Sequence, residues 1–273
     1  MARYSSALGY FVEPGRALQK LVRPDAPFER RLTWDAHPYP QYAYSLHKAA
    51  VLAQRLGIPE ISAVEFGVAG GRGLVQLEQH ARDVTALTQV KVRVFGMDSG
   101  GGLPPASTNK DLPYIWRAGQ FKMDHDALRA RLQGAQLLLG DVGDTVPQLI
   151  EAVAGAPVGF VSFDLDYYSS TARALELFDA PDDRLLPRVF CYFDDLIGAD
   201  DELHCEFAGE QLAINEFNAA HAERKLGQIQ GLRWKRRVPA VWNDTTFVLH
   251  CFEHPQYSQY IGLEDWQIPL DGD

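Results

Sequence analysis

Four aspartates lie in two pairs, each directly after a short apolar run. Asp164 and Asp166 follow one run, and Asp194 and Asp195 follow the next. If the runs are neighbouring parallel strands, their carboxyl ends meet at one edge of a sheet and the four carboxylates converge. Converging carboxylates disfavour joint ionisation unless a cation compensates, and oxygen-only ligands favour Mg²⁺, Mn²⁺ or Ca²⁺ over zinc. The alternative is two capped strand ends whose carboxylates hold no metal.

A glycine-rich turn is the second candidate site. Residues 64–73 read VEFGVAGGRG, which is neither a G-x-G-x-x-G dinucleotide fingerprint nor a P-loop. Glycines let a backbone approach a ligand, and a helix N-terminus supplies N–H donors that suit a carboxylate. An acid at the strand end suits an amino group, so the turn predicts an amino-acid-like ligand tail, with a ligand-free turn as the alternative. The residues concerned are Glu65, Gly67, Gly71 and Gly73.

Two further acids follow predicted strands. Asp98, with Ser99 behind it, closes the second strand, where a carboxylate can accept hydrogen bonds from both ribose hydroxyls of a nucleoside. Asp141 and Val142 follow the third strand, where the acid could recognise the amino group of an adenine. Solvated strand-end acids are the alternative interpretation. Combined with the glycine turn, these positions predict a nucleoside that carries an amino-acid tail.

The acids must be aligned by several strands of one sheet. From residue 62 onward, short β-branched runs alternate with segments whose apolar residues repeat at helical spacing, which is typical of βαβ units and a doubly wound, mostly parallel sheet. We expect strands over residues 63–68, 90–98, 136–140, 158–164, 189–194 and 245–252, and helices over residues 41–56, 74–82, 144–153, 170–178 and 206–224.

A long Gly/Pro-rich insertion over residues 100–119 follows the second strand. A structureless loop of that length in a compact domain is more often functional than idle, so we expect a lid or substrate loop. A tolerated surface insertion is the alternative.

At this point the chain resembles the class I S-adenosylmethionine-dependent methyltransferases, which carry a glycine motif, a ribose acid and an adenine-side acid at these three strand ends. The resemblance implies an α/β, Rossmann-like fold with a seven-stranded, mostly parallel sheet in the order 3-2-1-4-5-7-6, strand 7 antiparallel, and helices on both faces. Residues 62–273 would form the methyltransferase domain, and residues 1–61 an extension and helix that pack on the core or on a partner subunit. S-adenosylmethionine would be bound by Glu65, Gly67, Gly71, Gly73, Asp98, Ser99, Asp141, Val142 and Asp164.

The acidic cluster is similar to that of the macrocin O-methyltransferase family, metal-dependent sugar O-methyltransferases of bacterial natural-product pathways. The similarity lies in a D-x-D-x-Y-x-S-T pattern over residues 164–171, the later Asp194-Asp195 pair, and residues 97–104 and 140–147. It implies that Asp166, Asp194 and Asp195 hold Mg²⁺ or another divalent cation, with Asp164 nearby. The family's aromatic-acidic pair is replaced by glycines at positions 100 and 101, so we expect a different acceptor.

The implied reaction is methyl transfer to a hydroxyl of a small molecule, either a sugar or a natural-product-like acceptor. A bound cation lowers the pKa of the hydroxyl, and a neighbouring group takes its proton. Asp195 is the first candidate for base or metal ligand; Asp166 and His204 are the others, although a loop histidine is more often solvated. Two alternatives stay open: a catechol-type O-methyltransferase that chelates vicinal hydroxyls, and a nucleoside-binding regulatory protein without turnover.

The amino-acid composition disfavours several classes of binding partner and cellular location. The 273 residues carry 26 Lys and Arg against 36 Asp and Glu, a net charge of −10 that disfavours nucleic acid. Three widely spaced cysteines suggest neither a disulfide framework nor a zinc ribbon and fit a reducing cytoplasm. No apolar stretch approaches the roughly 18 residues of a membrane span. We expect a cytoplasmic homodimer or higher homo-oligomer that uses no membrane.

Overall fold

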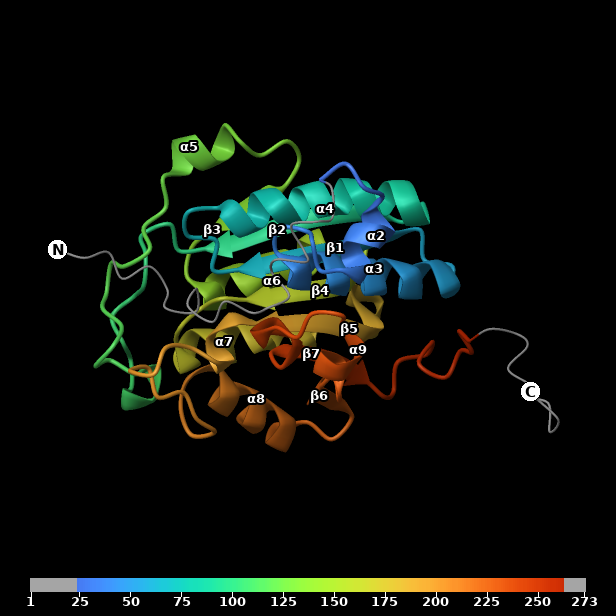
Figure 1. Cartoon of the computed structure of the whole chain (residues 1–273). Coiled ribbons are helices and arrows are strands. Elements are labelled where there is room, and N and C mark those ends of the chain that lie inside the picture. Colours follow the sequence, from blue (N-terminus) through green and yellow to red (C-terminus); the bar gives the residue numbers. More distant parts are fainter. Residues whose placement is uncertain (1–23, 263–273) are drawn as a thin grey trace.

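The computed structural model describes residues 24–262 and contains one seven-stranded sheet. The strand order is β3-β2-β1-β4-β5-β7-β6, and β7 runs antiparallel to both β5 and β6 while the other pairs are parallel (Figure 1). The predicted class I methyltransferase fold is thereby confirmed. The strands are β1 (Glu60–Phe66), β2 (Lys91–Asp98), β3 (Gln136–Leu139), β4 (Val158–Phe163), β5 (Leu185–Phe193), β6 (Arg224–Gln228) and β7 (Thr246–Cys251).

The central strands are nearly continuous apolar runs because helices cover both of their faces. Every residue of β4 is buried. At the carboxyl edge, Phe163 stacks on Phe66 at 5.5 Å between ring centroids and on Phe193 at 4.6 Å, so the last residues of β1, β4 and β5 form one row of rings. All three rings are fully buried, and each directly precedes the residues that follow its strand. The packing of this row sets the position at which each strand ends and the predicted site residues follow.

Two groups of helices flank the sheet. On one side α3 (Pro40–Arg55) packs on β1, β4 and β5, and α4 (Arg72–Thr88) packs on α3 and β2. On the other side α6 (Val142–Ala152), α7 (Tyr168–Ala174) and α8 (Gly209–Ala220) pack on one another in series. The crossover from β1 to β2 and those from β3 to β4 and from β4 to β5 run in opposite directions along the sheet, and right-handed connections therefore place their helices on opposite faces. Three short helices complete the fold: α2 (Phe28–Thr33), α5 (His125–Arg129) and α9 (Leu232–Lys235).

Within residues 24–262, every helix is too short or too polar to cross a lipid bilayer. Residues 1–23 of the expected N-terminal extension lie outside the described residues, as do residues 263–273. The part of the extension that the structure describes includes α3, which packs directly on the sheet.

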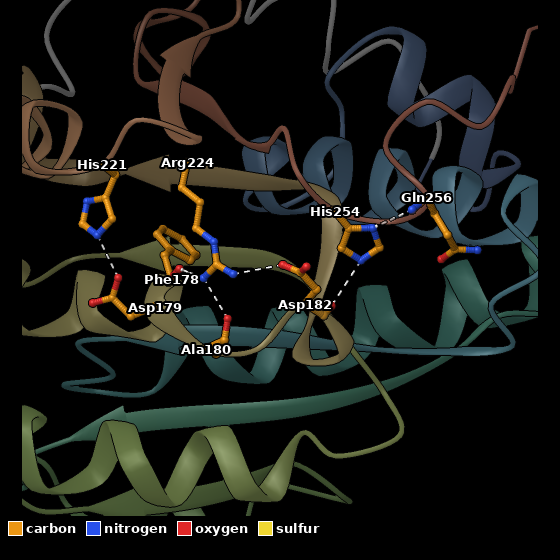
Figure 2. Close-up of polar contacts among 8 residues, drawn as sticks. All are labelled: Phe178, Asp179, Ala180, Asp182, His221, Arg224, His254 and Gln256. Carbon is orange, nitrogen blue, oxygen red and sulfur yellow. Dashed lines mark hydrogen bonds and ion pairs between the residues drawn. The ribbon is translucent and has the colours of Figure 1, made fainter.

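The edge strand β6 differs from the sequence expectation. We expected a helix over residues 206–224, but α8 ends at Ala220, and the polar sequence RKLGQ then forms β6. Arg224 holds this strand by donating to the carbonyl of Ala180 at 2.7 Å and to Asp182 at 2.9 Å (Figure 2). Beside it, His221 contacts Asp179 at 2.8 Å. Polar anchoring to the segment that precedes β5 therefore replaces the apolar burial that identifies the inner strands.

Candidate functional site

A cavity of about 240 Å³ opens at the carboxyl ends of β1, β2, β3 and β4. Six of the nine residues predicted to bind the cofactor line it, together with Asp166 and side chains of the insertion. The three that do not line it are Glu65, Gly71 and Gly73. Those that do are Gly67, Asp98, Ser99, Asp141, Val142 and Asp164.

Gly67 marks a close approach between two strand ends. Its φ is +83°, and a Cβ atom at this position would lie 1.7 Å from the backbone oxygen of Asp164. No side chain is compatible with that contact, so the turn after β1 requires glycine. The backbone of the turn thereby comes to the cavity wall.

The other two predicted glycines are explained by packing inside the protein. Gly71 is the N-cap of α4, and a Cβ there would lie 2.2 Å from a methyl of Leu128 on α5. A Cβ at Gly73 would lie 1.9 Å from Oε1 of Glu65. Neither glycine lines the cavity, and their predicted contact with a ligand stays a prediction.

Glu65 is buried in the core beside the cavity. Its Oε1 accepts a hydrogen bond from the hydroxyl of Tyr42 at 2.9 Å, and that hydroxyl accepts one from Ser162 at 2.9 Å. Its Oε2 has no hydrogen-bond partner among the described residues. Burial raises the pKa of Glu65 to about 8, although the Tyr42 hydroxyl opposes the shift. At neutral pH this carboxyl is therefore largely protonated, which weakens its predicted role as an anionic partner for an amino group.

Asp98 connects the glycine turn to the end of β2. Its Oδ2 accepts the N–H groups of Val68 at 2.9 Å and Ala69 at 2.8 Å, and its Oδ1 accepts that of Gly100 at 2.6 Å. A carboxylate offers about four acceptor positions, so Asp98 retains capacity toward the cavity that it lines. The residue thus positions the turn and still faces the space in which ribose hydroxyls were predicted.

Ser99 and Asp141 shape neighbouring turns. The Ser99 hydroxyl donates to the carbonyl of Gly102 at 2.8 Å. Asp141 is the N-cap of α6, where its side chain accepts the N–H of Gly143 at 2.9 Å. We expected this helix to begin at Asp144, but it begins at Val142, because Asp141 supplies the capping carboxylate.

The acidic cluster forms as expected, with one change of membership. Oxygen atoms of Asp164, Asp194 and Asp195 lie within 4.8 Å of one another. Asp166 instead turns its backbone N–H toward Oδ2 of Asp195 at 2.9 Å, because its φ of +59° is left-handed. Asp164, predicted only to lie nearby, thus belongs to the trio; Asp166 lines the cavity alongside, and its predicted role as a metal ligand stays a prediction.

Burial dominates the electrostatics of this cluster. It raises the pKa of Asp164 and Asp195 well above the usual range, and the neighbouring carboxylates add to the effect. The pKa of Asp166 rises to about 7 through burial and then the charges of Asp194 and Glu202. A cation placed among these oxygens would offset the repulsion.

Glu210 is a site residue that sequence reasoning missed. It is fully buried, and its Oε2 accepts the backbone N–H of Asp195 at 3.0 Å, which fixes the turn after β5. Burial raises its pKa well above the usual range. The sequence held a signal, since Glu210 lies on the same helical face as Ala213, Ile214 and Phe217, all of which are buried.

His204 is paired and buried. Its Nε2 lies 2.9 Å from Oε2 of Glu202, which also accepts the N–H of Ala199 at 2.9 Å. The His204 side chain is only 6% exposed, so the solvated alternative does not apply. His204 is absent from the cavity lining, and its predicted catalytic role stays a prediction.

The insertion is anchored over the site. At its base, Leu103 and the 119–120 segment exchange backbone hydrogen bonds of 2.8 and 2.9 Å. Near its tip, fully buried Asp111 accepts N–H groups of Ser107 and Thr108 and also that of Ser169 at the start of α7, at 2.8 Å. These bonds attach the insertion to the segment that follows the acids of β4. Its arms contribute Leu103, Pro104 and Phe121 to the cavity wall.

No family model and no curated protein matches the sequence. Among solved structures, the chain is similar to the calicheamicin methyltransferase CalS11, at 20% identity over 86% of this chain and 90% of that one, with a TM-score of 0.49. It is also similar to the O-methyltransferase TomG from Streptomyces achromogenes in complex with SAM, at 17% identity over 86% and 93% of the two chains and a TM-score of 0.45. An O-methyltransferase from Bacillus cereus in complex with SAH gives 14% identity over 86% and 94%, with a TM-score of 0.42. At these identities the likeness concerns the fold.

Proposed function

We propose that this protein is an S-adenosylmethionine-dependent O-methyltransferase that methylates a hydroxyl of a small molecule, assisted by a divalent cation. The observation that carries the proposal is the double membership of Asp164, which lines the cavity and also belongs to the carboxylate trio with Asp194 and Asp195. A methyl donor in the cavity and a hydroxyl at the trio would therefore be neighbours. Methyl transfer from a sulfonium is an in-line displacement, which such positioning favours.

The cavity has the hydrogen-bond acceptors and the apolar walls that the cofactor requires. Asp98 retains acceptor capacity for ribose hydroxyls, and Asp141 could accept from an adenine amino group. Leu103, Phe121 and Val142 supply apolar surface for the base. Carboxylates at this edge also complement the positive charge of the sulfonium.

The trio fits a hard divalent cation because all three side chains offer oxygen, and because a cation would offset the burial and mutual repulsion that raise the pKa of Asp164 and Asp195. Asp164, Asp194 and Asp195 would hold it. When bound, such an ion lowers the pKa of the acceptor hydroxyl and orients it. Asp166, which lines the cavity beside the trio, would take the proton.

A double substitution tests the role of the trio. Asp194→Asn with Asp195→Asn should remove metal-dependent methyl transfer while the Kd for S-adenosylhomocysteine, measured by calorimetry, changes by less than about threefold, because neither residue lines the cavity. Asp183→Asn is the matched control, since that exposed aspartate lies before the opposite end of β5.

Three results would contradict parts of the proposal. Unchanged wild-type activity in EDTA would remove the cation from it and leave the carboxylates as base and positioning groups. Tight binding of S-adenosylmethionine without transfer to any acceptor would favour the regulatory alternative. Absence of cofactor binding would refute the function altogether. The predicted homodimer or higher homo-oligomer is a separate proposal, which light scattering tests.

A further inference from the structure

A basic and aromatic surface lies on α9 and on the helices that precede β1. Residues 233–237 read RWKRR, the densest run of cations in the chain. Trp234 in this run is 84% exposed, the largest exposed fraction among the large apolar side chains of residues 24–262. Tryptophan and arginine are enriched among the residues that contribute most to binding between proteins. We call Trp34, Lys48, Trp234, Lys235 and Arg237 the basic face.

Side-chain contacts join the segment around α9 to α2 and α3. The guanidinium of Arg237 lies 4.8 Å from the centre of the Trp34 ring, at the end of α2. The cationic groups of Arg236 and Lys48 share one ring on α3, since they lie 5.1 and 5.7 Å from the centre of the Tyr44 ring. Burial and then the charge of Arg236 lower the pKa of Lys48. The cations of these segments therefore gather on one surface.

The basic face keeps an excess of positive charge. Arg236 pairs with buried Asp35, and Arg233 pairs with Asp244. Three exposed cations form no ion pair within residues 24–262: Lys48, Lys235 and Arg237. The exposed acid Glu29 borders the face, since its charge opposes the burial that lowers the pKa of the histidine before Lys48. Three unpaired cations against one acid, beside an exposed tryptophan, fit an acidic partner that also offers apolar side chains.

The same chain offers a surface of that kind. Residues 200–207 read DDELHCEF, and their exposed side chains include three acids and two apolar groups: Asp200, Asp201, Glu206, Leu203 and Phe207. The last two are 68% and 71% exposed. The three acids are not members of the carboxylate trio, so a cation bound there would leave them charged. The insertion touches this segment where the Tyr114 hydroxyl donates to the carbonyl of Glu202 at 2.7 Å, and its exposed Arg117 offsets part of the negative charge.

Within one copy, no hydrogen bond or ion pair in the described part of the chain joins residues 200–207 to the basic face. We propose that the basic face binds residues 200–207 of a second copy of this chain. Lys235 and Arg237 would pair with the acids of the segment and steer association. Trp234 would pack on the segment's two apolar side chains, which removes apolar area from water. A two-fold dimer makes this contact twice, and a head-to-tail arrangement repeats it into a ring or a filament. This inference goes beyond the proposed function and does not depend on methyl transfer.

Charge reversal of each surface tests the pairing. The face variant carries Lys235→Glu with Arg237→Glu, and the segment variant carries Asp200→Lys with Asp201→Lys. Each variant alone sets like charges against each other, whereas an equimolar mixture matches opposite charges at both possible contacts. The control, Arg129→Glu with Arg131→Glu, makes the same change of charge as the face variant at exposed positions of and after α5. Light scattering and sedimentation equilibrium give the oligomeric state and the Kd of association, and circular dichroism checks folding.

We expect wild type to associate, and its association to weaken about tenfold from low to high salt. The face and segment variants should be monomeric, their mixture should associate, and the control should match wild type. Trp234→Ser should weaken association about tenfold, or 1.4 kcal/mol, at either salt concentration. Loss of association in the control, wild-type association in either variant alone, or a folded but monomeric mixture would overturn the inference. A monomeric wild type would also overturn it, and binding of a polyglutamate peptide to that monomer would assign the face to another acidic partner.

Discussion

The buried carboxyl of Glu65 should make stability depend on pH in a direction opposite to that of most acids. Its pKa is raised to about 8 in the folded protein from an ordinary value of 4.5. A group with a raised folded pKa stabilises the fold most below its unfolded pKa, and that contribution is lost as pH rises through the folded value. Glu65→Gln keeps an oxygen for the Tyr42 hydroxyl but cannot ionise, so it should abolish this dependence.

The expected magnitude follows from proton linkage. Each pH unit between the two pKa values changes the free energy of unfolding by about 1.4 kcal/mol. Between pH 5 and pH 8, wild type should therefore lose roughly 3 to 4 kcal/mol relative to Glu65→Gln. That is a large share of the roughly 5 to 15 kcal/mol that stabilises a typical domain.

Urea unfolding at pH 5, 6, 7 and 8, in EDTA to exclude metal ions, measures the difference directly. Other titrating groups cancel to first order when wild type is subtracted from the variant. Glu60→Gln is the control, because Glu60 lies on the same strand but pairs with Arg93 at the surface. A wild-type minus Glu65→Gln difference that is constant across this range would refute the reasoning that burial suppresses ionisation of Glu65.

Three further predictions concern the turn, the insertion and the N-terminal helices. Gly71→Val should abolish S-adenosylhomocysteine binding in calorimetry, because its side chain would displace Leu128 and the start of α4; unchanged affinity would contradict this. Asp111→Ala should leave three N–H groups unpaired and lower the free energy of unfolding by about 2 kcal/mol. It should also speed tryptic cleavage at Arg117. Equal cleavage rates in the variant and in wild type would refute the anchoring role of Asp111. Burial lowers the pKa of His37 to about 4, so the free energy of unfolding should fall by roughly 2 kcal/mol between pH 6.5 and pH 4. His37→Gln should remove that part of the loss. An equal loss in the variant would show that the His37 ring titrates normally.

The sequence was most informative about the carboxyl edge of the sheet. Apolar runs of strand length each ended in an acid or a glycine, and parallel strands bring such ends together whatever the details of packing. The strand order followed from the resemblance of those ends to a known fold and was confirmed. Six of the predicted cofactor residues line one cavity for the same reason.

The sequence could not predict features that depend on contacts between distant residues or on a single dihedral angle. The bond from Tyr42 to Glu65 joins α3 to β1, and nothing local to either residue indicates it. The direction of the Asp166 backbone N–H, toward Asp195, accompanies a left-handed φ of +59° that the sequence does not indicate. β6 escaped detection because its sequence is polar apart from Leu226, and because the Arg224 contacts that anchor it join residues distant in sequence.

The position of β7 has a consequence for synthesis of the chain. β7 lies between β5 and β6, so the strand that completes the interior of the sheet is the last to leave the ribosome. Until Thr246–Cys251 emerges, one side of β5 has no strand to pair with, and an open apolar edge of this kind can template association with other chains. In nascent chains that stall before Thr246, β5 is therefore an aggregation-prone edge of a sheet that already contains β1 to β5. Emergence of Thr246–Cys251 is therefore the step at which this sheet can become complete.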